Sequence, residues 1–476
     1  MVLPMLYGED ESPYIQQFTW EFKESIDSQQ FLKAWQLVLG RHDVFYSRFS
    51  FNKQGMVEIR MADRPQMEFD YHDYIDLPRK AQCAKLKAFN SEDRARGFAP
   101  PRASLCRFNL FRLNKQRFQL LWTSHHCLFD GRSRLLLIRE FIEIYSALKN
   151  GKQPELPAAH AFAEFQKWMQ SHSFESSKKY WGDLLQGFDE PTPLFSELDL
   201  EPPKNTGQSV AKYTTSLSQS FSQKVHRWSK NHGVSINILA QTAWTIFLHK
   251  TSGNDLVVFG APRACRRSSI RSAEETVGLF VNTIPVAVEL TGSEKVETLV
   301  KRIRNQWRAD RDHENTPLHL IKETIGFKSN KPLFKSMVGF EKYQLCDLLL
   351  AETGKRYQVE LEGYTEIPLV IQVHDGPRLS IICTYHSTQF SESGIKQRVS
   401  CIEAILRQLI EHPSRELKDI QLMSKREIKQ SLRASLGKVV PLPGYAVHQR
   451  FEEMVINNPQ QTALVLENQR FSYEEL

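Results

Sequence analysis

The feature that most constrains the fold of this chain is a short apolar run that leads directly into a helical pattern. Residues Phe118–Ser124 read FQLLWTS, a nearly continuous apolar run without a charged side chain. Such a run fits a central strand that is buried on both faces. Apolar residues then recur at intervals of three or four from Leu136 to Leu148, and Asn150-Gly151 ends the pattern. A buried strand followed by a helix predicts an α/β fold.

Strands and helices are expected on both sides of a connector. Residues 14–22 alternate between apolar and polar side chains, as in a half-buried strand, and a helical pattern follows Ser28. Between residues 151 and 195, four prolines flank an aromatic helix, which we interpret as a connector between two lobes. The aromatic residues Phe162, Phe165 and Trp168 are expected to be core or lobe contacts. Further strands are expected at 257–260, 277–288, 371–373 and 379–384.

Composition and charge exclude several classes of protein. The chain has no run of about 18 apolar residues, so no transmembrane helix is expected. Its N-terminus lacks the basic and apolar regions of a secretory signal. The seven cysteines are scattered without a Cys-x-x-Cys pair, which favours free thiols in a reducing cytoplasm. A net charge of +7 over 476 residues is too mild for a nucleic-acid-binding surface. The composition therefore predicts a cytoplasmic protein with no membrane or nucleic-acid partner.

The residues that carry chemistry lie between the predicted strand and the predicted helix, in the stretch TSHHCLFDGRS at 123–133. Adjacent residues of an extended strand point to opposite sides, so one of His125 and His126 is expected in the core and the other at a cavity. Asp130 would either orient an imidazole or bind an arginine from elsewhere. Gly131 would permit a backbone turn that other residues disfavour. A purely structural histidine pair is the alternative, and a metal site is not expected because too few ligands converge.

The string HHCLFDG resembles the HHxxxDG signature of condensation domains in nonribosomal peptide synthetases, which belong to the chloramphenicol-acetyltransferase-like superfamily. Further segments resemble the family's other motifs, in family order over residues 1–430. They are RHDVFYSRF at 41–49, GAPRACR at 260–266, VGLFVNT at 277–283, HENTPL at 313–318, PLF at 332–334 and GFEKY at 339–343. Residues 445–476 resemble the opening of an adenylation domain. In the first segment only Pro4-Met5-Leu6-Tyr7 matches the family pattern. Asp43, Tyr46 and Arg132 replace a family Glu, Arg and Trp.

The resemblance implies an architecture of two chloramphenicol-acetyltransferase-like lobes that form a V with a central tunnel. The N-terminal lobe is expected at 1–176 and the C-terminal lobe at 177–430. Residues 431–476 would be a linker and the truncated beginning of an adenylation domain. Because the opening motif is incomplete, the chain could be a fragment of a larger synthetase or the product of a split gene.

The resemblance also implies a reaction, which is amide formation between two thioesters carried on phosphopantetheine arms. The arms belong to upstream and downstream peptidyl carrier proteins and meet at His126, which would take a proton from the amine or orient it. His125 would support the loop, and Asp130 would pair with Arg266. The Gly131 N–H would serve as an oxyanion donor, and Asn282 and Thr283 would line the tunnel or hydrogen-bond at a strand edge. The domain is expected to be monomeric and to bind no cofactor or metal of its own.

Other functions of the same superfamily are disfavoured. An epimerization domain would carry its own late motifs, and a heterocyclization domain would replace His125 with Asp. The adenylation-like tail argues against a stand-alone acyltransferase that uses coenzyme A. A recruitment platform without catalysis and a catalytically inactive fragment remain open as alternatives.

Overall fold

The computed structural model describes residues 14–52, 57–63, 65, 67–98, 105–194, 210–328, 331–342, 345–363, 365–423, 425–437, 444 and 446–476. Four features predicted from the sequence lie outside the described residues. They are Pro4-Met5-Leu6-Tyr7, Tyr343, residues Pro441-Leu442-Pro443 of the predicted linker, and Tyr445. The contacts within the chain divide it into one unit that ends at Leu422 and a second, smaller unit that begins at Met423.

The larger unit contains a five-stranded sheet in the order β11-β1-β6-β5-β4. Its strands are β1 (Ile15–Phe22), β4 (Glu68–Asp73), β5 (Cys106–Asn114), β6 (Arg117–His125) and β11 (Gln358–Glu362). Strand β6 lies at the centre, antiparallel to both β1 and β5. The predicted central strand is confirmed, because every residue from Phe118 to His125 is buried.

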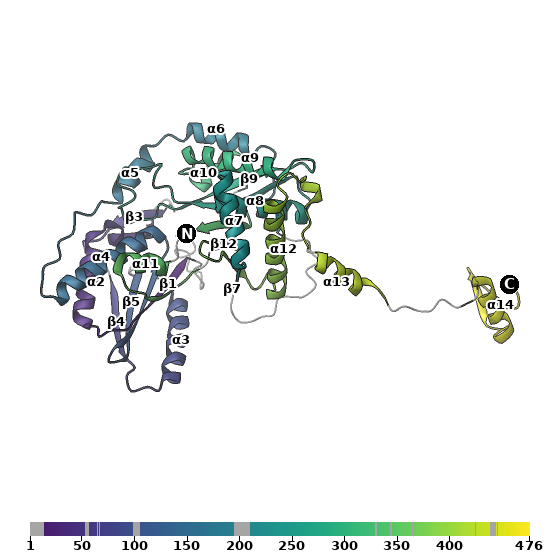
Figure 1. Cartoon of the computed structure of the whole chain (residues 1–476), viewed down its shortest axis with the longest axis horizontal. Coiled ribbons are helices and arrows are strands. Elements are labelled where there is room, and N and C mark those ends of the chain that lie inside the picture. The colour runs from purple at the N-terminus through teal and green to yellow at the C-terminus, as the bar shows by residue number, and fades with distance from the viewer. Residues whose placement is uncertain are drawn as a thin grey trace. The chain divides into compact units, whose positions relative to one another are not determined.

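Helices cover both faces of this sheet, as Figure 1 shows. The elements around it are α2 (Ser28–Arg41), η1 (Asp43–Tyr46), α3 (Arg79–Arg96), α4 (Gly131–Lys149) and α11 (Leu345–Thr353), with a separate hairpin of β2 (Ser47–Phe51) and β3 (Val57–Met61). Leu120 and Trp122 of β6 join the core shared with α2 and α4. Leu121, on the opposite face, packs with Leu86 of α3. The alternation of a strand therefore places the two layers of helices on opposite sides.

A second sheet of six strands has the order β7-β13-β12-β10-β8-β9. Its strands are β7 (Val210–Ser216), β8 (Leu256–Arg263), β9 (Asn282–Glu289), β10 (Ser336–Glu341), β12 (Leu369–His374) and β13 (Ser380–His386). The predicted late pair is confirmed, because β12 and β13 are antiparallel neighbours joined by a turn at Gly376-Pro377.

Helices also pack on both faces of the second sheet. They are α6 (Glu175–Leu184), α7 (Gln219–His232), α8 (Ile236–Ser252), α9 (Val296–Ala309), η2 (Asp310–Asp312), α10 (Leu318–Thr324), α12 (Glu392–Glu411) and η3 (Leu417–Asp419). Helix α5 (Ala163–Ser171) belongs to the connector, where its Phe165 packs with Ala273 and Phe280 from the loop that precedes β9. The main core lies between the sheet and α7, α8, α9 and α12. A smaller core joins Trp181 of α6 and Ile321 of α10 to Val258 and Ile284 of the sheet. Two sheets with separate cores confirm the two-lobed α/β architecture.

The strand expected over 277–288 begins later than predicted. β9 starts at Asn282, and residues 277–281 are an irregular segment instead. Their backbone is engaged elsewhere: Asp130 N–H donates to the carbonyl of Gly278, and Phe280 N–H donates to the Asp130 carboxylate. Backbone groups that pair with the other lobe cannot pair with a neighbouring strand.

The smaller unit contains α13 (Lys425–Ser435), α14 (Val447–Asn457) and an antiparallel hairpin of β14 (Thr462–Leu466) and β15 (Gln469–Ser472). Phe451 of α14 contacts Tyr473, with ring centroids 5.4 Å apart. No described helix of the chain is long and apolar enough to cross a membrane.

Candidate active site

The two histidines of the HHCLFDG segment have different surroundings, as the strand geometry requires. His125 ends β6 and is 0% exposed. Its Nδ1 accepts a hydrogen bond from the backbone N–H of Cys127 at 3.2 Å, and its ring lies near Tyr14 and Phe98. Burial lowers the pKa of His125 to about 3. His125 is therefore a neutral, core-facing residue beneath the loop.

His126 is only half-buried, and its hydrogen bond determines its tautomer. Nδ1 lies 2.9 Å from the carbonyl oxygen of Phe129. Because a carbonyl can only accept, Nδ1 must carry the proton and Nε2 of the neutral ring must carry the lone pair. Nε2 has no hydrogen-bond partner among the residues that the structure describes.

The electrostatic surroundings keep the His126 imidazole neutral. Burial lowers its pKa below the ordinary value of 6.5, and the positive charge of Arg134 acts in the same direction. The Phe129 carbonyl and Asp130 oppose this change. At neutral pH the ring therefore presents Nε2 as a proton acceptor, which is the state that a general base requires.

No hydrogen bond or ion pair joins Asp130 to the side chain of His125 or His126. Asp130 caps the N-terminus of α4, where Oδ1 accepts a hydrogen bond from Ser133 N–H at 2.9 Å and lies 3.0 Å from Ser133 Oγ. Oδ1 also lies 2.7 Å from Nη2 of Arg266, and Oδ2 accepts from Phe280 N–H at 3.2 Å. Of the two roles left open by the sequence, binding an arginine from elsewhere is the one that the geometry provides.

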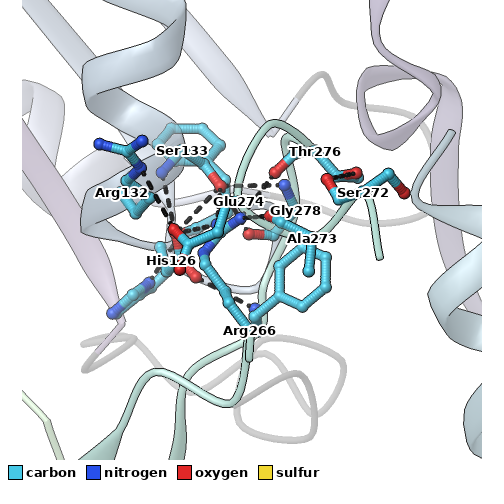
Figure 2. A network of polar contacts seen from close by, with 12 residues as sticks. His126, Arg132, Ser133, Arg266, Ser272, Ala273, Glu274, Thr276 and Gly278 are labelled. Atoms are coloured by element: carbon cyan, nitrogen blue, oxygen red, sulfur yellow. Dashed lines mark hydrogen bonds and ion pairs between the residues drawn. The ribbon is translucent and has the colours of Figure 1, made fainter. Parts of the chain in front are cut away.

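Arg266 lies in the loop that connects β8 to β9, so its contact with Asp130 joins the two lobes. Both side chains are nearly inaccessible, at 2% and 1% exposure. Nη1 of Arg266 donates to the carbonyls of Ala273 and Thr276, and Nη2 also donates to Ser133 Oγ at 2.8 Å. Figure 2 shows Ser133, Arg266 and Gly278 meeting in one network beside His126. We call Asp130, Ser133, Arg266, Gly278 and Phe280 the Asp130 cluster.

Ser133 is a member of this cluster that the sequence analysis missed. Its hydroxyl donates to the carbonyl of Gly278 at 2.8 Å and accepts from the N–H of the same residue at 3.0 Å. Asp is a favoured residue immediately before a helix, where its carboxylate accepts a hydrogen bond from the backbone N–H two or three positions later. That spacing was a signal for an N-cap at Asp130.

Gly131 does not have the backbone conformation expected from the sequence. It is the first residue of α4, and it is not among the glycines with positive φ. A Cβ built on Gly131 would meet no atom within 4 Å. The expectation of a special turn is therefore wrong: the glycine leaves open space at an exposed helix N-terminus. Its N–H has no hydrogen-bond partner among the described residues.

Arg134 is a second buried charge that the sequence did not reveal. It is 1% exposed, and its guanidinium lies over the rings of Trp122 and Phe129 at 5.0 and 5.1 Å. Nη2 donates to the amide oxygen of Gln16, while Nε and Nη1 have no partner among the residues that the structure describes. The aromatic faces offset part of the cost of burying this charge. Its position one turn into α4 explains its effect on His126.

Asn282 and Thr283 lie at the start of β9, at the edge of the second sheet. The amide of Asn282 donates to the carbonyls of Glu314 and Thr316 at 2.9 and 2.8 Å. Thr283 Oγ1 lies 3.8 Å from Sδ of Met337. The Asn282 contacts favour the strand-edge interpretation for this residue. Among the described residues, no group of three or more His, Cys, Asp or Glu is placed to hold a metal ion.

Comparison with known proteins identifies relatives for nearly the whole chain. A family model described as "Condensation domain" matches residues 4–432. The chain is 28% identical over 479 residues to one of the linear gramicidin synthase proteins of Brevibacillus parabrevis, a match that covers 100% of this chain and 9% of that protein. Two other proteins of the same synthase are also 28% identical to the chain. The chain spans only 6–9% of the length of these three relatives.

Solved structures show the same fold. A four-domain nonribosomal peptide synthetase bound to AMP and glycine matches with a TM-score of 0.79 and 17% identity, over 99% of this chain and 37% of that chain. The starter condensation domain of rhizomide synthetase matches with a TM-score of 0.73 and 16% identity, over 89% of this chain and 97% of that chain.

Proposed function

The chain belongs to the condensation-domain family of nonribosomal peptide synthetases, and on this basis we propose that it joins two carrier-bound thioesters through an amide bond. The donor is an acyl or peptidyl thioester, and the acceptor is an aminoacyl thioester with a free α-amine. Both are delivered on phosphopantetheine arms of carrier proteins, which enter a tunnel between the lobes from opposite faces. Thr283 would lie along that tunnel.

The observation that carries this proposal is the state of His126, a neutral imidazole whose Nε2 has no hydrogen-bond partner in the described chain. The acceptor amine, with a pKa of about 7.7–8.0, attacks the thioester carbonyl carbon in its neutral form. The nitrogen becomes cationic and gives its proton to Nε2. The C–S bond then breaks, and the thiolate of the donor arm leaves and takes up the proton that Nε2 held, which restores the neutral imidazole.

The surrounding residues take supporting roles in the proposed mechanism. The exposed Gly131 N–H, at the N-terminus of α4, would donate to the oxygen of the tetrahedral intermediate. The Asp130–Arg266 pair would hold the loop without exchanging protons, and His125 would support it from the core. Only His126 and Gly131 would therefore touch reacting atoms.

The proposal extends to the arrangement of the whole chain. Residues 1–176 and 177–430 would be the two lobes, and residues 431–476 a linker with the opening of an adenylation domain, within a chloramphenicol-acetyltransferase-like superfamily. The natural partners would be an upstream and a downstream peptidyl carrier protein and an adenylation domain. The domain would act as a monomer in the cytoplasm.

A single-turnover assay read by intact-protein mass spectrometry tests the proposal. The parent protein receives a loaded donor carrier and a loaded acceptor carrier, and the expected product is a dipeptidyl mass on the acceptor. His126→Ala should abolish the product while the protein remains folded. His249→Ala is the matched control, because His249 Nδ1 also donates to a backbone carbonyl, that of Asn254, at 2.8 Å in the other lobe.

Two results would contradict amide formation at His126. Equal yields from the parent and from His126→Ala would remove His126 from the mechanism. A folded parent that makes no product from a panel of loaded carriers would favour the recruitment platform or the inactive fragment.

A further inference from the structure

The segment RHDVFYSRF resembles a family motif, but the proposed chemistry does not use it. Its third residue, Asp43, lies just after α2 and reaches the connector that leads from one lobe to the other. Asp43 Oδ1 accepts a hydrogen bond from Phe162 N–H, and Oδ2 accepts one from Ala163 N–H, both at 2.9 Å. The carboxylate thus satisfies two free N–H groups at the N-terminus of α5 and lies at its positive end.

The two residues before Asp43 hold the same region. Arg41 donates to the Glu140 carboxylate at 2.9 Å and to the Pro157 carbonyl at 2.6 Å. His42 is buried, and its Nε2 lies 3.0 Å from Glu140. Three consecutive residues therefore attach both α4 and the connector to the end of α2.

The residue that Asp43 holds in place, Phe162, presses on the irregular segment 277–281. A Cβ built on Gly278 would lie 2.0 Å from Cδ2 of Phe162, so the ring rests directly on the glycine backbone. Gly278 has no positive φ, and the close approach of the ring is the reason why only glycine fits. The Phe162 ring also meets Phe280 edge to face at a centroid distance of 5.3 Å.

Gly278 and Phe280 are the residues through which this segment contacts the catalytic loop. The Gly278 carbonyl accepts from Asp130 N–H at 3.3 Å and from Ser133 Oγ at 2.8 Å. The Phe280 N–H donates to Asp130 Oδ2, and its ring lies 4.3 Å from Cζ of Arg266. The contacts run without a gap from Asp43 through Phe162 to the Asp130 cluster, close in sequence to His126.

We propose that Asp43 is a positioning residue for the catalytic loop, acting through Phe162 and the segment 277–281. The proposal rests on the proposed function only for its effect on turnover. Its structural part, the coupling between Asp43 and the loop at 126–133, stands independently of the reaction. Asp43 itself does not touch the reacting atoms.

Hydrogen–deuterium exchange read by mass spectrometry tests the coupling without an activity assay. In Asp43→Ala, peptides covering 126–133 and 277–281 should exchange at least about tenfold faster, because the backbone hydrogen bonds that join them lose their support. Asp27→Ala is the matched control: Asp27 also accepts two backbone N–H bonds at a helix N-terminus, from Gln29 and Gln30 at 3.0 and 3.1 Å. It should lower the melting temperature similarly and leave exchange in both peptides unchanged.

Single-turnover kinetics with saturating carriers then show the functional effect. Asp43→Ala should slow amide formation by about tenfold to a hundredfold, since small misplacements of catalytic groups have effects of this size. The affinity for the carriers should not change. Asp43→Asn, which keeps one acceptor oxygen, should form the amide at a rate between those of the parent and of Asp43→Ala. The rate of Asp27→Ala should equal that of the parent.

A double variant shows whether Phe162 transmits the effect. Asp43→Ala and Phe162→Ala interrupt the same path of contacts. The double variant should therefore show the same exchange rate and the same rate of amide formation as the more strongly affected single variant. Effects that add would show two independent paths and overturn the proposal. Exchange at 126–133 that is equal in Asp43→Ala and Asp27→Ala would also overturn it, whatever the activity of the parent.

Discussion

Removing the Asp130 carboxylate should destabilise the protein more than it changes the chemistry directly. In Asp130→Ala, Arg266 would keep its charge in a site that is almost completely buried and would lose its carboxylate partner at 2.7 Å. Ser133 N–H and Phe280 N–H would lose their acceptor as well. The substitution therefore combines an unpaired buried charge with the loss of a helix cap.

The expected magnitude follows from these two losses. Breaking one side of a buried ion pair costs about 3–5 kcal/mol, and losing an Asp N-cap costs about 1 kcal/mol. The free energy of unfolding should therefore fall by about 4–6 kcal/mol, out of the roughly 5–15 kcal/mol that a protein domain commonly has. Because the pair joins both lobes, this loss should affect the larger unit as a whole.

Urea unfolding at equilibrium measures this change, with the double variant Asp130→Ala/Arg266→Met as the control. Removing both charges leaves no unpaired ion, so the double variant should be more stable than Asp130→Ala alone by at least about 2 kcal/mol. Asp130→Ala protein that unfolds at the same urea concentration as the parent, but makes no amide, would refute the structural assignment and give Asp130 a direct role in catalysis.

Three further predictions concern the same site and one distant buried acid. The rate of amide formation should fall with unit slope below about pH 8, because the acceptor amine is protonated there. The slope should steepen only below pH 6.5, because burial and Arg134 lower the pKa of His126. Steepening above pH 6.5 would contradict this. In Gly131→Ala the free energy of unfolding should stay within about 0.5 kcal/mol of the parent's, since the new Cβ has open space. Turnover should nevertheless be about tenfold slower or more, because the methyl group occupies that space. Unchanged turnover would show that the oxyanion does not lie at this position. Burial raises the pKa of Asp310 to about 7, so the unfolded chain releases this proton at a lower pH than the folded chain, and stability falls as pH rises from about 4 to 7. Asp310→Asn should therefore have a higher melting temperature than the parent at pH 8 and a similar one at pH 4. A lower melting temperature at pH 8 would show that the carboxylate is ionised in the folded protein.

Local patterns in the sequence predicted the elements that carry the site. The apolar run before His125 became the central strand β6, and the apolar periodicity after Asp130 became α4. Both predictions depend on the burial of one continuous segment, which neighbouring residues report directly. The opposite surroundings of His125 and His126 also follow from strand geometry, since successive side chains alternate.

Other features could not be predicted because their partners lie far along the chain. Phe280 bonds to Asp130 from 150 residues away, which is why β9 starts at Asn282 instead of Val277. Asp43 reaches Phe162 across 119 residues. Gly131 was interpreted from residue type alone, whereas the glycine that a close contact requires is Gly278.

Residue spacing within short segments was enough to predict several of the strands and helices and the position of the histidine pair at the end of a buried strand, and the motifs were enough to indicate the family to which the chain belongs. Which groups of the site are still able to react depends instead on the folded chain. Asp130, Arg266 and Ser133 use their polar atoms on one another, whereas His126 keeps a neutral ring with Nε2 unbonded in the described chain. The physical reason is that burial and hydrogen bonding, which set both charge and tautomer, arise only when segments distant in sequence meet.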